Sequence, residues 1–94
     1  MKTVLVVDDR PANLALLEDI LNSAGYKVIS AQDGSQGLEQ VKTHLPDLII
    51  SDILIPNMDG FEFCHSIHAL PDGAKTPFFF LTGAYVSQDD EEFV

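Results

Sequence analysis

Residues 48–60, LIISDILIPNMDG, place a carboxylate, Asp52, directly behind a run of apolar residues. The run lacks polar alternation, which is typical of a strand covered on both faces of a parallel sheet. The Pro, Asp and Gly that follow favour a turn leading into a helix. The stretch therefore predicts a buried strand over 47–51, with Asp52 held at its carboxyl end.

The same two patterns alternate along the rest of the chain. Short apolar, β-branched runs predict further strands over 3–7, 27–31 and 77–81. Apolar residues at helical spacing, among them Ile20, predict helices from Pro11 to near Gly25, over 34–43, and from Asp59 to about Leu70. This alternation implies right-handed crossovers, a parallel sheet and helices on both faces. We therefore expect an α/β fold, a doubly wound sheet of four strands, as a single domain over residues 1–94.

The end of the chain predicts the start of one more helix. Residues 88–92, QDDEE, fit an acidic first turn, which the helix dipole favours. The strand over 77–81 would then form an open apolar edge, whose unpaired N–H and C=O groups can recruit another chain. We therefore expect a homodimer or segment exchange that covers this strand.

Composition limits the classes of function. An apolar share of 46% with 21% charged residues favours a packed core over disorder. No stretch reaches the ~18 apolar residues of a membrane span, and no secretory signal is present, so we expect a cytoplasmic protein without a membrane anchor. A net charge of −10 with five Lys and Arg residues argues against direct binding to nucleic acid. A single cysteine excludes an intramolecular disulfide.

The predicted sheet gathers polar residues at one edge, because the carboxyl ends of parallel strands share it. They are Asp8 and Asp9 after the first strand, Asp52 after the third, and Thr82 with Gly83 after the fourth. Clustered carboxylates repel one another unless a cation joins them, and Mg²⁺ is the hard, oxygen-binding ion we expect here. Asp52 could then attack phosphorus, while Thr82 could hydrogen-bond a phosphoryl oxygen.

These motifs, in this order, resemble the receiver domain of two-component response regulators. The resemblance rests on the acidic pair after the first strand, Ser51-Asp52, the PNMDG turn at 56–60, and Leu81-Thr82, and it runs from residue 3 to about residue 86. It implies a flavodoxin-like (CheY-like) fold. It also implies that Asp52 accepts a phosphoryl group from a sensor histidine kinase or a histidine phosphotransfer protein, and that an output domain or effector receives the signal.

The resemblance further assigns a metal site. Asp9 and Asp52 would bind Mg²⁺ directly and Asp8 mostly through water. The backbone carbonyl of Leu54 would complete the protein's share of the ligands.

Switching and turn residues follow from the same resemblance. Thr82 would move toward the phosphoryl oxygens, and Gly83 beside it would let the backbone approach closely. Pro56 and Gly60 would shape the turn. The family's Lys at the end of a fifth strand has no counterpart in these residues, since Lys75 precedes the fourth strand. We expect its absence to weaken phosphate-dependent switching.

Several residues have simpler interpretations. Asp8 or Asp9 could be an N-cap of the first helix, and Thr82 an ordinary strand end. Cys64, on the third predicted helix, is expected to be a small residue of the protein core. His65 and His68 share that helix but lack a third metal ligand, so we expect them on a solvated face, and His44 is not expected to donate phosphate.

Two other functions fit part of the pattern. A pseudo-receiver, acting only in protein interaction or dimerisation, fits the missing Lys. A Mg²⁺-dependent phosphohydrolase fits the Asp nucleophile, but it would need a second acid at the position that Leu54 occupies. We therefore expect a regulatory phosphoacceptor that assists its own phosphotransfer and dephosphorylation, and not a turnover enzyme.

Overall fold

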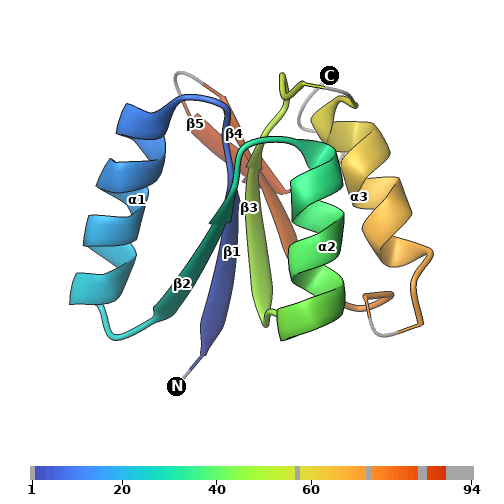
Figure 1. Ribbon diagram of the computed structural model, residues 1–94, viewed down its shortest axis with the longest axis horizontal. Helices are drawn as coiled ribbons and strands as arrows, with labels where there is room; N and C mark the ends of the chain where they lie inside the picture. The colour runs from blue at the N-terminus through green and yellow to red at the C-terminus, as the bar shows by residue number, and fades with distance from the viewer. Residues whose placement is uncertain (1, 57, 72, 83–84, 89–94) are drawn as a thin grey trace.

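The computed structural model describes residues 2–56, 58–71, 73–82 and 85–88, which form one five-stranded sheet with helices on both faces (Figure 1). In chain order the elements are β1 (Thr3–Val7), α1 (Pro11–Ser23), β2 (Lys27–Ala31), α2 (Gly34–His44), β3 (Leu48–Asp52), α3 (Gly60–His68), β4 (Phe78–Thr82) and β5 (Tyr85–Gln88). The strand order is β2-β1-β3-β4-β5, and the first four of these strands are parallel. The predicted α/β class with its parallel sheet is confirmed.

The predicted boundaries agree with the structure to within about two residues. β1 and β2 begin and end where the sequence placed them, whereas β3 and β4 lie one residue later than predicted. Asp52 is therefore the last residue of its strand and not the first of a loop. The predicted third helix is shorter, because α3 ends at His68.

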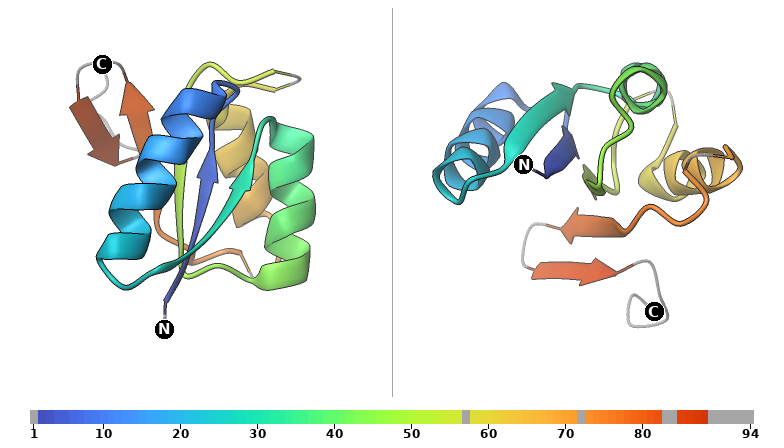
Figure 2. Two further views of the ribbon diagram at one scale, coloured as in Figure 1. Left: turned by 60° about the vertical axis from the view of Figure 1, so that its left-hand side comes forward. Right: turned by 90° about the horizontal axis from the view of Figure 1, so that it is seen from below.

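The sheet separates two layers of apolar side chains. Val4 and Val6 of β1 pack with Leu14 of α1 on one face. Leu5 and Val7, the alternate residues of the same strand, pack against α2 and α3 on the other face. Figure 2 shows the sheet standing between α1 and the other two helices. Because both faces of β1 are covered, its sequence carries no polar alternation.

Only part of the predicted apolar stripe of α1 is buried. Leu17 and Leu21 pack on the core beside Leu14, but 54% of Ile20 is exposed, so Ile20 shares the helical spacing without sharing the burial. Ile20 lies about 100° around the helix from Leu21, beyond the stripe that faces the sheet. Among the residues that the structure describes, no helix combines the length and the apolar character needed to cross a membrane.

The chain beyond β4 differs from the prediction. Residues 85–88 form β5, which pairs antiparallel with β4 from Thr82↔Tyr85 to Phe79↔Gln88. Gln88 is therefore in a strand and not in a helix, while residues 89–92 lie outside the described part of the chain. The prediction that β4 has an open edge is wrong, because β5 pairs with it. The expected dimer therefore loses the observation on which it was based. Pairing with the next residues along the chain satisfies the backbone of β4 at a small loop-closure cost.

Candidate metal centre

Three carboxylates meet at the carboxyl edge of the sheet. β1 and β3 are neighbours in register, with Val7 opposite Ser51, so the residues that follow Val7 come to lie beside Asp52. One oxygen from each of Asp8, Asp9 and Asp52 lies within 4.8 Å of the other two. The predicted convergence of these three acids is therefore present.

Asp8 is the buried member of the cluster, with 1% of its surface exposed. Its Oδ1 accepts the backbone N–H of Arg10 at 2.9 Å, and its Oδ2 accepts the side-chain amide of Asn13 at 3.1 Å. These hydrogen bonds offset the cost of burying a carboxylate. The N-cap of α1 is Arg10, without a side-chain capping bond, so the alternative in which Asp8 or Asp9 caps this helix is wrong.

Asp52 presents its carboxylate at the mouth of the cluster, where 13% of the side chain is exposed. Its Oδ1 lies 3.4 Å from the backbone N–H of Leu54, which donates a long hydrogen bond. Its Oδ2 accepts from Nη2 of Arg10 at 3.0 Å. The carboxylate is thus oriented from two sides while remaining accessible.

Arg10 is a site residue that the sequence reasoning missed. Its guanidinium contacts Oδ1 of Asp8 through Nε at 3.4 Å as well as Asp52. The hydrogen bond and charge of Asp8, followed by the charges of Asp52 and Asp9, raise the pKa of Arg10 above its ordinary value. A basic residue directly after an acidic pair at a strand end was the sequence signal.

The predicted switch residue lies at the same edge. Leu81 is the register partner of Asp52 in the neighbouring strand, and Thr82 follows it as the last residue of β4. The side chain of Thr82 and all of Gly83 lie outside the described part of the chain. Pro56 is exposed in the loop between β3 and α3.

Gly60 brings the start of α3 against the end of β3. Its N–H donates to the carbonyl of Ile53 at 2.6 Å, and Asp59 before it caps the helix by accepting from the N–H of Glu62 at 2.8 Å. A Cβ at residue 60 would lie 2.8 Å from the carbonyl oxygen of Asp52 and 2.9 Å from the Cα of Ile53. Any larger side chain must displace the backbone that carries the carboxylate.

Gly60→Ala is therefore expected to destabilise the fold by about 1–3 kcal/mol and to weaken divalent-cation binding. Urea unfolding with and without Mg²⁺ measures both effects. Gly34→Ala is the control for metal binding, because its Cβ would lie nearest to side-chain atoms of Met58, closest to Cγ, and not against the backbone that carries Asp52. It should leave the metal affinity unchanged. A Gly60→Ala protein with unchanged stability and metal affinity would contradict this account of the turn.

The donor set of the cluster fits a hard divalent cation. All three groups are carboxylates, and such oxygen ligands are those that Mg²⁺ prefers. Three acidic groups against the one guanidinium leave an excess of negative charge that a divalent ion can offset.

His68 differs from its predicted solvated position. Its ring is half-buried and stacks edge-on against Phe78 with centroids 6.3 Å apart. Nε2 lies 3.0 Å from the carbonyl oxygen of Thr76, and Nδ1 lies 3.7 Å from Sγ of Cys64. The His68 side chain lies against the protein, and not in solvent, because the loop before β4 provides a backbone carbonyl within hydrogen-bond distance. Cys64 is buried as predicted, and His65 is exposed.

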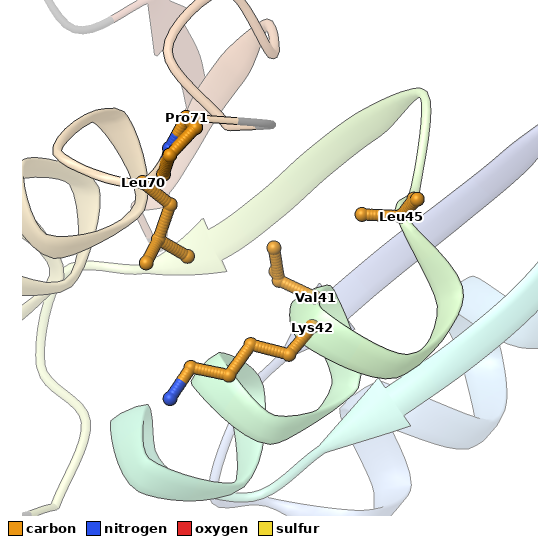
Figure 3. Close-up of a pocket in the computed structure, with 5 residues that line it drawn as sticks. All are labelled: Val41, Lys42, Leu45, Leu70 and Pro71. Atoms are coloured by element: carbon orange, nitrogen blue, oxygen red, sulfur yellow. The ribbon is translucent and has the colours of Figure 1, made fainter.

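A shallow hollow lies at the opposite edge of the sheet, between the carboxyl ends of α2 and α3 (Figure 3). It has a volume of about 220 Å³ and is lined by Val41, Lys42, Leu45, Leu70 and Pro71. Since helices in this fold run back from the carboxyl edge of the strands, the hollow is separate from the carboxylate cluster.

Comparison with known proteins identifies the family. The sequence model of the response regulator receiver domain matches residues 4–94. The transcriptional regulatory protein PhoP of Bacillus subtilis is 42% identical over 66 residues, which cover 70% of this chain and 28% of PhoP. The histidine-protein kinase BarA of Escherichia coli is 37% identical over 92 residues, 98% of this chain and 10% of BarA. The chain thus spans less than a third of either relative.

A solved structure agrees with this assignment. The receiver domain of the sensor histidine kinase PA1611 from Pseudomonas aeruginosa PAO1, which has a magnesium ion coordinated in its active site cleft, is 31% identical. It superposes with a TM-score of 0.83, covering 88% of this chain and 68% of that one. With nearly the whole chain matched and three acids at the carboxyl edge of the sheet, this protein belongs to the response regulator receiver domain family of two-component signalling.

Proposed function

We propose that Asp52 accepts a phosphoryl group from a phosphohistidine on a sensor histidine kinase or a histidine phosphotransfer protein. The observation that carries this proposal is the convergence of three carboxylates at the carboxyl edge of a receiver fold. Asp8, Asp9, Asp52 and the backbone carbonyl of Leu54 would hold Mg²⁺ there. Membership of a regulatory family and relatives that include a histidine kinase support the same reading.

In this proposal Asp52 acts as the nucleophile. In the transfer an oxygen lone pair of Asp52 forms the new O–P bond, while the P–N bond to the donor breaks and its electron pair returns to the imidazole. The N–H of Leu54 donates to Oδ1 and Nη2 of Arg10 donates to Oδ2, and these two hydrogen bonds orient the carboxylate. Mg²⁺, when bound, offsets the negative charge that would otherwise keep carboxylate and phosphoryl group apart.

The remaining residues of the edge have supporting roles in this proposal. Asp8 is buried and hydrogen-bonded on both oxygens, which suits a ligand that acts through water. Asp9 is exposed and suits direct coordination. Thr82, the last residue of β4, follows the register partner of Asp52. In this proposal Thr82 and Gly83 would respond to the new phosphoryl oxygens, and that response would relay the signal.

The signal would pass to an output domain or effector protein. One relative is a transcriptional regulatory protein, and this chain matches 28% of its length. The rest of that relative is long enough to contain an output domain. Direct contact with nucleic acid is no part of the proposal, because a chain of net charge −10 repels phosphates. The chain's single cysteine, Cys64, is buried, and the lack of a cysteine pair fits the reducing cytoplasm, where we place the protein.

The proposal is tested by incubating the chain with Mg²⁺ and a small acyl phosphate, followed by intact mass spectrometry. We expect one added phosphoryl group, which disappears when EDTA replaces Mg²⁺. A chain that gains no phosphoryl group would overturn phosphoacceptance and leave an interaction module. Rapid release of phosphate over many turnovers, with no phosphoryl group accumulating on the chain, would instead indicate a hydrolase.

A further inference from the structure

The Arg10 side chain joins the two strands that carry the acids. It begins at the junction of β1 and α1, where its backbone N–H already binds Oδ1 of Asp8 at 2.9 Å. Its Nε lies 3.4 Å from the same oxygen, and its Nη2 reaches Oδ2 of Asp52, 42 residues further along the chain, at 3.0 Å. One cation therefore contacts both the buried acid and the phosphoacceptor.

The guanidinium lies at the mouth of the cluster and not inside it. Its side chain is 61% exposed, whereas the Asp8 side chain that it contacts is 1% exposed. An ion pair with an exposed partner is worth little, because water and salt screen it, so the arginine can leave at a small cost. Arg10 therefore contacts the carboxylates through weak ion pairs that can break at a small free-energy cost.

A divalent cation and Arg10 compete for the same groups. Both require the negative charge of Asp8 and Asp52, and two cations held by one carboxylate cluster repel each other. Nη2 of Arg10 already occupies Oδ2 of Asp52, so this oxygen is available to another cation only after the arginine has left. The metal-bound state therefore requires Arg10 to move away from Asp52.

We propose that Arg10 is a built-in counter-cation that neutralises the cluster in the metal-free protein and releases Asp52 when a divalent cation binds. Arg10 is thus a positioning residue that sets the metal affinity of the site. The inference rests on the proposed function, because the cluster it regulates is the phosphotransfer site. Binding linkage then fixes the sign of each effect: what stabilises the metal-free form weakens metal binding.

Arg10→Gln tests this competition. We expect the variant to bind Mn²⁺, followed by the electron paramagnetic resonance signal of the free ion, about three- to tenfold more tightly than the wild type, from the loss of two screened ion pairs. Its melting temperature should be lower than the wild-type value without metal and equal to it at saturating Mg²⁺. An arginine with only a structural role would lower both melting temperatures and would not raise the affinity.

Two further variants make the result specific. Lys27→Gln removes the same charge from an exposed residue at the start of β2, at the edge of the sheet opposite the carboxylate cluster. The metal affinity should be nearly unchanged, because salt screens the interaction between Lys27 and the cluster. Arg10→Lys keeps the charge but loses the planar fork, which donates to two carboxylates at once, and should give an intermediate affinity.

The outcomes separate this inference from the proposed function. If the wild type binds Mn²⁺ and forms a phosphoryl adduct, but Arg10→Gln binds with equal or lower affinity, the counter-cation role is overturned while phosphoacceptance stands. An affinity increase in Lys27→Gln as large as in Arg10→Gln would also overturn it, since net charge alone would explain both. A chain that neither binds metal nor forms the adduct in any variant overturns both.

Discussion

Asp52→Asn is expected to abolish the phosphoryl adduct completely. The amide has nearly the same size and its oxygen can still accept the N–H of Leu54, so the loop should keep its shape. It lacks the negative charge and the nucleophilic carboxylate oxygen that the transfer needs. Intact mass spectrometry after incubation with Mg²⁺ and acyl phosphate measures the loss.

Asp19→Asn is the control for Asp52→Asn. Asp19 is an exposed acid on α1 and is not part of the carboxylate cluster, so its replacement should leave the adduct at the wild-type level. Circular dichroism of both variants checks that the fold is retained. A phosphoryl group that persists in Asp52→Asn would place the acceptor on another residue and refute the assignment.

Phe63→Ala should have the largest effect on stability, a loss of about 3–5 kcal/mol. Phe63 is fully buried between α3 and the sheet, with its ring edge-on to Phe78 at a centroid distance of 5.4 Å. A Cβ at Gly37 of α2 would lie only 2.6 Å from its ring, which shows how closely the helices pack around it. For a domain whose total stability is about 5–15 kcal/mol, this is a large fraction. Urea unfolding followed by circular dichroism measures the loss.

Phe61→Ala is the matched control on the same helix. Phe61 also packs against an aromatic ring, that of Phe80 at 4.7 Å, but 43% of its surface is exposed. The same truncation should therefore cost only about 1–2 kcal/mol. Equal losses in the two variants would mean that burial of Phe63 in the α2–α3 layer does not control stability.

The success of the sequence predictions has a local physical basis. Strands buried on both faces must be apolar throughout, and this is why the run before Asp52 predicted a central strand. The parallel arrangement then obliged the residues after each strand to share one edge, so Asp8 and Asp9 could be expected beside Asp52. Gly60 could be recognised as a turn residue, but the close approach to the Asp52 carbonyl that requires it is a tertiary contact.

The incorrect predictions concern groups whose partners are distant in the sequence or were chosen by competition. His68 was expected in solvent because no third metal ligand was in view, whereas the folded chain brings the Thr76 carbonyl to its ring. Residues 88–92 were expected to begin a helix from their acidic composition. Gln88 is instead in β5, since the unpaired backbone of β4 offers hydrogen bonds that an exposed helix turn cannot match.

The amino-acid sequence by itself determined the order of strands and helices, the two-sided burial of the sheet and the edge at which the acids meet, because each depends on periodicity and on strand direction. Only the tertiary structure decided how the negative charge of that edge is balanced by a neighbouring cation. Arg10 reaches Asp52 across 42 residues of chain because β1 and β3 lie side by side. The local sequence puts Arg10 next to Asp8 and Asp9, but its contact with Asp52 is set by strand pairing.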